Sequence, residues 1–300
     1  MKNGKSPAGH HTLLEKHILR WYRTSARSLP WRRTRNPFKI LISEVMLQQT
    51  QVSRVRQKYG PFLRRFPSPD ALARATPASV IRAWSGMGYN NRAVRLRSLA
   101  QTVVAEYGGR LPRDIKQLRE LPGIGKYTAH AVACFAYGQP VPVVDTNISR
   151  VLSRLFPKST LDVWDLASRV LPKRSSYEWN QGLMELGATI CRSSNPRCSD
   201  CPIKGLCPSA FMAVQRLQKP PRNEPGRDGV PNRIYRGRII DALRNRGRNS
   251  TGLVSIGKRI KPGYSPGDRP WLLRVLANLE RDGLILKTKN GRGISVRLAT

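Results

Sequence analysis

Apolar residues recur at helical spacing through most of the chain up to residue 207. Amphipathic segments alternate with short polar breaks, and few runs alternate as a strand would. The breaks, among them RNP, FPSP, GGRLP and GQP, contain the proline and glycine that are typical of loops. The pattern predicts a compact all-α region with helices near 12–27, 38–57, 90–107, 126–137, 147–155 and 175–190.

The pattern changes after Cys207. The stretch QKPPRNEPGRDGVPN is rich in proline, glycine and charge, which is typical of an exposed linker. Beyond it, RIYRGRIIDALRNR and DRPWLLRVLANLERDG have helical spacing, and LILKTKNGRGISVRLA resembles two strands around a turn. This is the order of a winged helix. We therefore predict a helical domain at 1–211, a linker at 212–232 and a basic winged-helix-like α+β domain at 233–300.

The charge balance narrows the class of partner. The 300 residues include 54 Lys and Arg against 18 Asp and Glu, a formal net charge of +36 that would attract a polyanion. Because the basic residues are interleaved with the apolar pattern, a folded nucleic-acid-binding protein is favoured over a cationic ribosomal or membrane-surface protein. Residues 211–300 alone carry 20 basic and 6 acidic side chains, which suits either contact with phosphates or a solvated basic face.

The chain offers no membrane signal. Its first residues lack an apolar run of signal-peptide length, and no later stretch is long enough to span a bilayer. We therefore expect a cytoplasmic, nucleoid-associated protein without a membrane partner. In that compartment cysteines stay reduced, which favours metal or cluster binding over disulfides.

Four of the five cysteines lie together in CRSSNPRCSDCPIKGLC, with spacing C-x6-C-x2-C-x5-C. Four soft thiolates in one short loop can hold zinc or an iron–sulfur cluster, and the spacing by itself does not choose between them. No histidine or carboxylate in the loop offers an open catalytic position, so a structural role is favoured. The candidate ligands are Cys191, Cys198, Cys201 and Cys207. Cys134, in the apolar run AVACFAYG, is expected to be a buried small hydrophobe.

A glycine hairpin separates two predicted helices in LPGIGKYTA. Gly123 and Gly125 permit a tight connection, and the helix that follows begins with unpaired amide donors beside Lys126. Such a hairpin can grip a phosphate, although an ordinary turn between helices would also contain glycine.

Two carboxylates stand out. Asp145 precedes TNISRVLSRLF, where it could simply cap the helix, and the positive helix end would favour an ionised carboxylate that Asn147 could orient. Glu44 lies among apolar residues in FKILISEVMLQQTQV, where burial would raise its pKa, although a solvated helix face is the commoner place for glutamate. An acid paired with an ionised carboxylate is the combination that breaking a glycosidic bond requires.

Over residues 12–207 the chain closely resembles the helix-hairpin-helix DNA glycosylases, and within them the MutY-type adenine glycosylases. The resemblance rests on six segments in the order of the family: LPWRRTRNPFKILISEVMLQQTQV, GMGYNNRA, LPGIGKYTA, VVDTN, WNQGLMELGATIC and the cysteine loop. It implies a mainly α helix-hairpin-helix glycosylase fold and a [4Fe-4S] cluster at the four cysteines. It also implies a monomeric enzyme that acts on double-stranded DNA containing a mismatched or damaged base pair.

The resemblance implies a role for each site residue. Such enzymes flip a nucleotide out of the duplex because its glycosidic bond cannot be reached inside the stack. Glu44 would protonate the departing adenine and Asp145 would stabilise the oxocarbenium-like sugar, while Tyr127 and Asn147 would shape this site. Tyr127 stands where related lyases carry a nucleophilic lysine, so lyase activity is expected to be weak or absent. The residues expected to contact DNA are Gln49, Thr50, Met87, Tyr89, Gly123, Gly125 and Lys126.

The resemblance leaves two other functions open. No Nudix-like module is recognisable after residue 218, and Asn90 replaces an aromatic residue of the family, which leaves the choice between guanine and 8-oxoguanine as opposing base open. A sister branch removes thymine or uracil opposite guanine, although Glu44 within SEVMLQQT favours adenine. A non-catalytic DNA-binding protein on the same scaffold is the alternative from another class. Met87 and Tyr89 could each pack in a core, although the glycines on both sides of Met87 also suit an exposed wedge.

Overall fold

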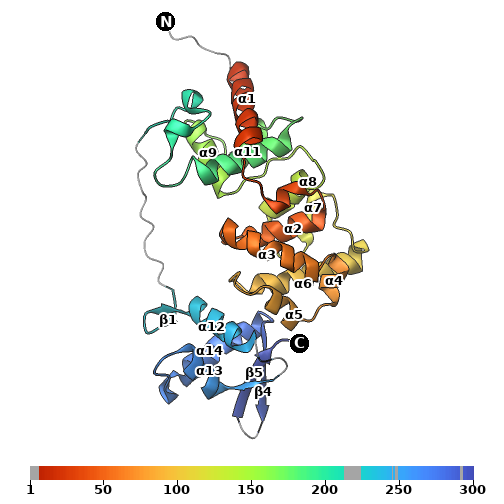
Figure 1. The fold of residues 1–300 in the computed structure, drawn as a ribbon, viewed down its shortest axis with the longest axis vertical. Coiled ribbons are helices and arrows are strands. Elements are labelled where there is room, and N and C mark those ends of the chain that lie inside the picture. The colour runs from red at the N-terminus through yellow and green to blue at the C-terminus, as the bar shows by residue number, and fades with distance from the viewer. Residues whose placement is uncertain (1–6, 213–223, 245, 247–248, 291–292) are drawn as a thin grey trace. The chain divides into compact units, whose positions relative to one another are not determined.

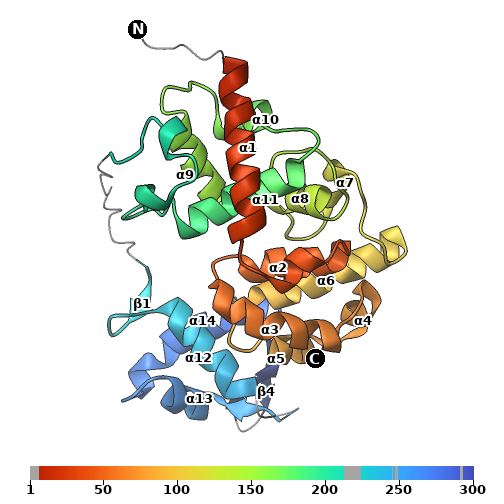
Figure 2. The same ribbon diagram turned by 45° about the horizontal axis from the view of Figure 1, so that its top comes forward.

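The computed structural model describes residues 7–212, 224–244, 246, 249–290 and 293–300 (Figures 1 and 2). The chain forms two compact units. The first contains Met1–Leu41, Arg113–Arg119 and Ile124–Lys219, and the second contains Ile42–Pro112, Glu120–Gly123 and Pro220–Thr300, so far as these ranges are described. Of the linker expected at 212–232, residues 213–223 lie outside the described part of the chain.

The first unit is helical. Helix α11 packs against both α1 and α9, and the apolar side chains of these three helices form its core. Two glycines of α11 allow this close packing: a Cβ at Gly182 would meet Ile18 Cγ2 at 2.9 Å, and one at Gly187 would meet Asn147 Cβ at 2.6 Å. The elements are α1 (Pro7–Ser25), η1 (Pro30–Arg33), α7 (Ile115–Glu120, whose last residue belongs to the second unit), α8 (Lys126–Phe135), α9 (Thr146–Leu155), α10 (Val163–Arg169), α11 (Ser176–Thr189), η2 (Cys198–Asp200) and η3 (Lys204–Leu206).

The second unit begins with a second group of helices. Helices α4 and α5 each begin with an N-cap residue, Ser68 or Thr76, that is followed by proline. The side-chain hydroxyl of each cap accepts a hydrogen bond from the amide three residues later, which stabilises the start of the helix. The helices are α2 (Pro37–Leu47, which begins in the first unit), α3 (Val52–Arg65), α4 (Pro69–Arg74), α5 (Pro77–Ala83) and α6 (Asn91–Tyr107). The helices expected near 90–107, 126–137, 147–155 and 175–190 are confirmed as α6, α8, α9 and α11.

The single helix expected over 38–57 is wrong, because the structure breaks it at 48–51. Gln49 adopts the left-handed region with φ 53°, which no helix interior accommodates. The carbonyls of Val45, Met46 and Gln48, at the end of α2, instead accept hydrogen bonds from Arg92 of α6. The apolar pattern of the sequence continues through this break and does not predict it. The end of the helix is visible only in the contact with Arg92.

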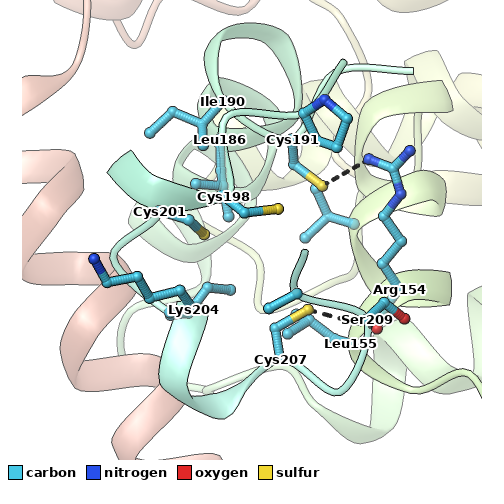
Figure 3. A pocket seen from close by; sticks show the side chains of 14 residues that line it. Arg154, Leu155, Leu186, Ile190, Cys191, Cys198, Cys201, Lys204, Cys207 and Ser209 are labelled. Atoms are coloured by element: carbon cyan, nitrogen blue, oxygen red, sulfur yellow. Dashed lines mark hydrogen bonds between the residues drawn. The ribbon is translucent and has the colours of Figure 1, made fainter. Parts of the chain in front are cut away.

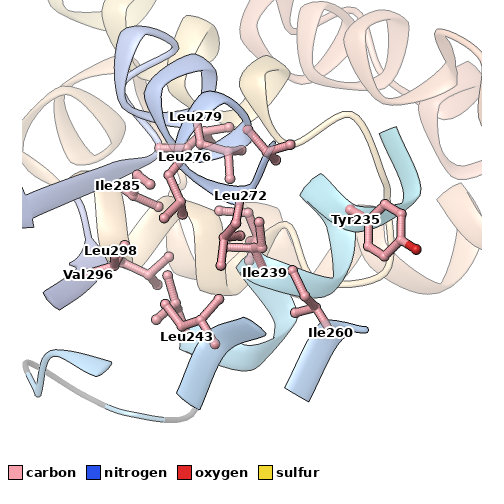
Figure 4. Close-up of a cluster of buried hydrophobic side chains, with 14 of the residues drawn as sticks. Tyr235, Ile239, Leu243, Ile260, Leu272, Leu276, Leu279, Ile285, Val296 and Leu298 are labelled. Atoms are coloured by element: carbon pink, nitrogen blue, oxygen red, sulfur yellow. The ribbon is translucent and has the colours of Figure 1, made fainter. Parts of the chain in front are cut away.

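Residues 224–300, which we call the C-terminal module, form the winged helix expected from the sequence. Three helices alternate with a three-stranded antiparallel sheet in the order β3-β5-β4, around a core that includes Ile239, Leu272, Leu276 and Val296 (Figure 4). A short hairpin of β1 (Gly226–Arg227) and β2 (Val230–Pro231) precedes them. The elements are α12 (Asn232–Arg244), β3 (Thr251–Gly252), α13 (Leu253–Ile260), η4 (Pro266–Asp268), α14 (Arg269–Arg281), β4 (Ile285–Asn290) and β5 (Gly293–Leu298).

Five elements of this module were not expected from the sequence: β1 and β2, which fall in the expected linker, and β3, α13 and η4. The turn expected between the last two strands includes residues 291–292, which lie outside the described residues. Within the part of the chain that the structure describes, no helix is both long and apolar enough to cross a membrane.

Candidate active site

Asp145 stands at the start of α9, in the first unit, as its N-cap. Its Oδ1 accepts a hydrogen bond from the Ile148 amide at 2.7 Å, and its Oδ2 accepts one from Asn147 Nδ2 at 2.8 Å. The capping role and the contact with Asn147 that the sequence suggested are therefore both confirmed. The two bonds occupy both carboxylate oxygens and hold the side chain in one orientation.

The environment of Asp145 acts on its pKa in two directions. Burial raises the pKa of the carboxyl above its usual value, while the hydrogen bonds from Ile148 and Asn147 and the positive charge of Arg150 oppose that rise. The net direction is upward. We expected the helix start to favour the ionised form, and it does contribute in that direction, but burial is the larger effect.

Arg150, one turn further along α9, connects this carboxylate to the cysteine loop. Its Nη2 donates to Asn147 Oδ1 at 2.8 Å and to the Gly187 carbonyl at 2.7 Å, and its Nε donates to the Cys191 carbonyl at 2.7 Å. A continuous series of hydrogen bonds therefore runs from Asp145 to the first cysteine. Sequence reasoning missed Arg150, although its position three residues after Asn147 places both side chains on one helix face.

Helix α8 carries the other predicted site residues of the first unit. Tyr127 is half-buried at its start, and Lys126 is exposed with its Nζ 4.2 Å from the centre of the Trp164 ring. Gly125 is the N-cap of α8, and Gly123, which belongs to the second unit, has φ 81°.

Glu44 lies in the second unit and is buried, with 5% of its surface exposed. The solvated helix face that we considered for this residue is therefore wrong. Tyr59 lies near enough for the two groups to interact: burial raises the pKa of Tyr59 to about 12, and the charge of Glu44 adds to this rise.

The residues expected to contact the mismatch in the second unit occupy two loops. Gln49 and Tyr89 both adopt the left-handed region, at φ 53° and 42°, and both are exposed. Such conformations are unfavourable for residues other than glycine and persist where surrounding contacts enforce them. Met87 is only 3% exposed, so the exposed wedge that its flanking glycines suggested is wrong, whereas Tyr89 is 51% exposed. Thr50, half-buried, directs its hydroxyl toward the Met87 carbonyl at 3.4 Å.

The buried side chain of Arg92 donates hydrogen bonds to both of these loops. Its Nη1 donates to the end of α2, and its Nη2 donates to Thr50 Oγ1 at 3.0 Å, to the Met87 carbonyl at 2.9 Å and to the Gly88 carbonyl at 3.3 Å. Its guanidinium also faces the Trp84 ring, 5.2 Å from the ring centre. The side chain is 7% exposed, and burial lowers the pKa of Arg92 to about 10. No sequence signal distinguished this arginine from the many others.

The four loop cysteines line one cavity of about 40 Å³ in the first unit, next to the end of α11 (Figure 3). All four are free and half-buried, and Arg154 Nη1 lies 3.2 Å from Cys191 Sγ. Burial raises the pKa of Cys201 to about 11, and the neighbouring thiols add to the rise. Cys134 is fully buried away from this loop, as expected.

The donor set of this cavity suits a thiolate-bound metal or cluster. Four thiols with no histidine or carboxylate among them are one ligand set that binds structural zinc or an iron–sulfur cluster, and Arg154 supplies a positive charge beside them. Among the described residues, no group of three or more histidine, cysteine, aspartate or glutamate side chains is arranged to hold a metal ion. The fit therefore rests on the chemistry of the ligands and on the cavity that they share.

Comparison with known proteins agrees with this geometry. Residues 42–165 match the HhH-GPD superfamily of base excision DNA repair proteins. The adenine DNA glycosylase of Mycobacterium tuberculosis is 37% identical over 306 aligned residues, which cover 96% of this chain and 95% of that protein. Because so little of the chain is left out, the match extends into the C-terminal module.

Two solved structures resemble a large part of the chain. A thermostable thymine-DNA glycosylase is 33% identical with a TM-score of 0.66, covering 70% of this chain and 100% of that one. A trapped covalent intermediate of endonuclease III with DNA is 25% identical with a TM-score of 0.58, covering 67% of this chain and 96% of that one.

Proposed function

Because the chain belongs to the adenine DNA glycosylases of the helix-hairpin-helix superfamily, we propose that it removes adenine mispaired with guanine or 8-oxoguanine from duplex DNA, as a step of base excision repair. The observation that carries the proposal is the match to an adenine DNA glycosylase over nearly the full length of both chains. The net charge of +36 supports a DNA substrate.

Glu44 is the acid of this proposal. Its carboxyl is buried among apolar residues of α2, and we assign it the transfer of a proton to the adenine that departs. Protonation makes the base a better leaving group, because the electron pair of the glycosidic bond then leaves on a neutral adenine.

Asp145 stabilises the positive charge that develops on the sugar. Its oxygens are fixed by Ile148 and Asn147, so little reorganisation is needed when the charge appears. Water then completes the hydrolysis at the sugar carbon, either directly or after a covalent intermediate with Asp145. Tyr127 stands where related lyases carry a nucleophilic lysine, and Lys126 faces the Trp164 ring, so β-lyase activity is weak.

DNA contacts come from the hairpin and the two exposed loops. The amides after Gly123 and Gly125, with Lys126, grip a backbone phosphate. Gln49, Thr50 and Tyr89 enter the gap left by the flipped adenine and contact the opposing base. The left-handed conformations of Gln49 and Tyr89 support this assignment, because strained backbone is concentrated at functional sites.

The cofactor of the proposal is a [4Fe-4S] cluster held by Cys191, Cys198, Cys201 and Cys207. The cluster supplies structural cross-linking of the loop when bound. Through the carbonyl of Cys191, the loop backbone also positions Arg150 and so contributes to the orientation of Asp145.

A second candidate function is removal of thymine or uracil opposite guanine. It is favoured by the likeness to a thymine-DNA glycosylase, which is 33% identical to this chain. The two candidates predict different substrates, so one experiment separates them.

The test uses purified protein and end-labelled duplexes that contain one A·8-oxoguanine, A·G, T·G or U·G pair, followed by alkali to cleave abasic sites. Cleavage at adenine is expected, and cleavage confined to thymine or uracil would support the second candidate. Asp145→Asn should abolish base release and leave duplex binding unchanged. Asp162→Asn is the matched control, because Asp162 also caps a helix through its side chain and has no proposed chemical role. Mismatch binding without cleavage by the wild-type protein would indicate a non-catalytic DNA-binding protein.

A further inference from the structure

The loop that presents Tyr89 is unusually constrained. Residues 84–90, which we call the reading loop, connect α5 to α6, and three of them have positive φ: Gly86 at 80°, Gly88 at 67° and Tyr89 at 42°. Of these three residues only Tyr89 has a side chain, and 51% of its surface is exposed. A conformation of this kind needs support from outside the loop.

A hydrogen-bonded contact from the C-terminal module supplies such support. Arg244, the last residue of α12, donates from Nη2 to Asn90 Oδ1 at 2.7 Å and from Nε to the Ile81 carbonyl at 3.4 Å. In return, Arg82 Nε donates to the Arg244 carbonyl at 3.1 Å. Asp241, one turn earlier on α12, forms an ion pair with the Arg244 guanidinium and orients it. Arg244 is 9% exposed, so this contact is shielded from water.

Apolar packing reinforces the same contact. Ala78 and Ile81 of α5 are buried in one cluster with Ile239 and Leu243 of α12. Val94, in the first turn of α6, packs against that cluster. Gly283 of the module lies close to it, because a Cβ at Gly283 would be 3.4 Å from Val94 Cγ1. The module therefore contacts both α5, which precedes the reading loop, and α6, which follows it. Arg244 also donates a hydrogen bond to Asn90, the residue directly after Tyr89.

We propose that the C-terminal module sets the conformation of the reading loop, and that Arg244 and Asn90 are the positioning pair through which mismatch recognition depends on the module. This proposal rests on the proposed function, because the loop has a mismatch to read only in a glycosylase of this kind. It assigns the module a role in specificity that is separate from any contact of its own with DNA. Neither residue touches the reacting atoms.

The test compares full-length Asn90→Ala, Arg244→Met and the double variant with the wild type. Methionine keeps the apolar stem of Arg244 and removes its hydrogen bonds. Asn91→Ala is the matched control, because the neighbouring asparagine has no role in this contact. Binding is measured to a duplex in which a non-cleavable 2′-fluoro adenosine analogue faces 8-oxoguanine, and to the same duplex with an A·T pair, at a temperature well below every unfolding midpoint.

Each single substitution should weaken binding to the mismatched duplex by about tenfold, as expected for a shielded hydrogen bond from a charged donor, with A·T binding unchanged. The double variant should be no worse than the poorer single variant, because both remove one interaction. Asn90→Asp, which keeps the acceptor, should restore most of the loss. Asn91→Ala should behave as the wild type.

Three results would overturn the proposal. Wild-type mismatch affinity in both single variants would show that the pair positions nothing. Additive losses would show that the two residues act separately. An equal loss on the A·T duplex would show a general effect on DNA binding or folding. A wild-type protein that neither prefers nor cleaves any of the four mismatched duplexes would instead contradict the proposed function, and that outcome is distinct from all three.

Discussion

Asn147 joins Asp145 to Arg150, because its amide nitrogen donates to Asp145 Oδ2 at 2.8 Å and its carbonyl oxygen accepts from Arg150 Nη2 at 2.8 Å. Arg150 also holds the backbone of α11 and of the cysteine loop. Two segments that lie about forty residues further along the chain therefore contribute, through Arg150 and Asn147, to the orientation of the candidate catalytic carboxylate.

Removal of the Asn147 donor should shift the pH dependence of base release. The reaction needs Asp145 ionised, and the hydrogen bond from Asn147 opposes the rise in its pKa that burial causes. In Asn147→Ala the pKa should rise further, so the acid limb of the single-turnover rate profile should move to higher pH. The maximal rate should also fall by about tenfold or more as the carboxylate loses its orientation. An unchanged acid limb would show that Asn147 does not act on the Asp145 carboxyl.

Two glycines of α11 should separate positioning from packing. Gly187→Ala places a methyl group 2.6 Å from Asn147 Cβ, which must shift Asn147 and lower the excision rate strongly. Gly182→Ala, in the same helix, meets Ile18 Cγ2 at 2.9 Å and should cost about 1–3 kcal/mol of unfolding free energy while sparing the chemical step. Equal excision rates in the two variants, corrected for the folded fraction, would contradict this division.

Arg92 should be essential to the stability of the second unit. Arg92→Met leaves the carbonyls at the end of α2 and in the reading loop without their donor, and we expect a loss of about 2–4 kcal/mol in unfolding free energy. Arg95→Met, on the exposed face of the same helix, should change it by less than about 0.5 kcal/mol. Denaturant unfolding followed by circular dichroism measures both. A loss under about 1 kcal/mol in Arg92→Met would show that water replaces the guanidinium at little cost.

The cysteine assignment predicts which thiols matter for iron. Cys198→Ser should reduce bound iron and the visible absorbance of the purified protein, because a serine oxygen is a poor replacement for a soft thiolate. Cys134→Ala should retain both, since Cys134 is fully buried outside the loop. If elemental analysis of anaerobically purified protein finds zinc in place of iron, the assignment of the four cysteines as ligands would stand and the assignment of a [4Fe-4S] cluster would be wrong.

The sequence by itself determined what depends on local order. Helical periodicity located α6, α8, α9 and α11, and a change of pattern predicted the winged-helix order of the C-terminal module, because burial of one helix face or one strand face repeats over a few residues. The cysteine spacing and the Asp145 cap were equally visible, since ligands in one loop and a cap with its helix lie within a few residues of one another.

Only the tertiary structure decided what depends on contacts between distant segments. The break in the expected 38–57 helix depends on hydrogen bonds from Arg92 to carbonyls 44 to 47 positions earlier, and the contact of Arg244 with Asn90 spans 154 positions. Periodicity reports whether a position is buried, but it carries no information on which remote carbonyl a guanidinium will reach. In a chain with 54 basic residues, the few arginines that position the site become distinguishable only by their hydrogen-bond partners.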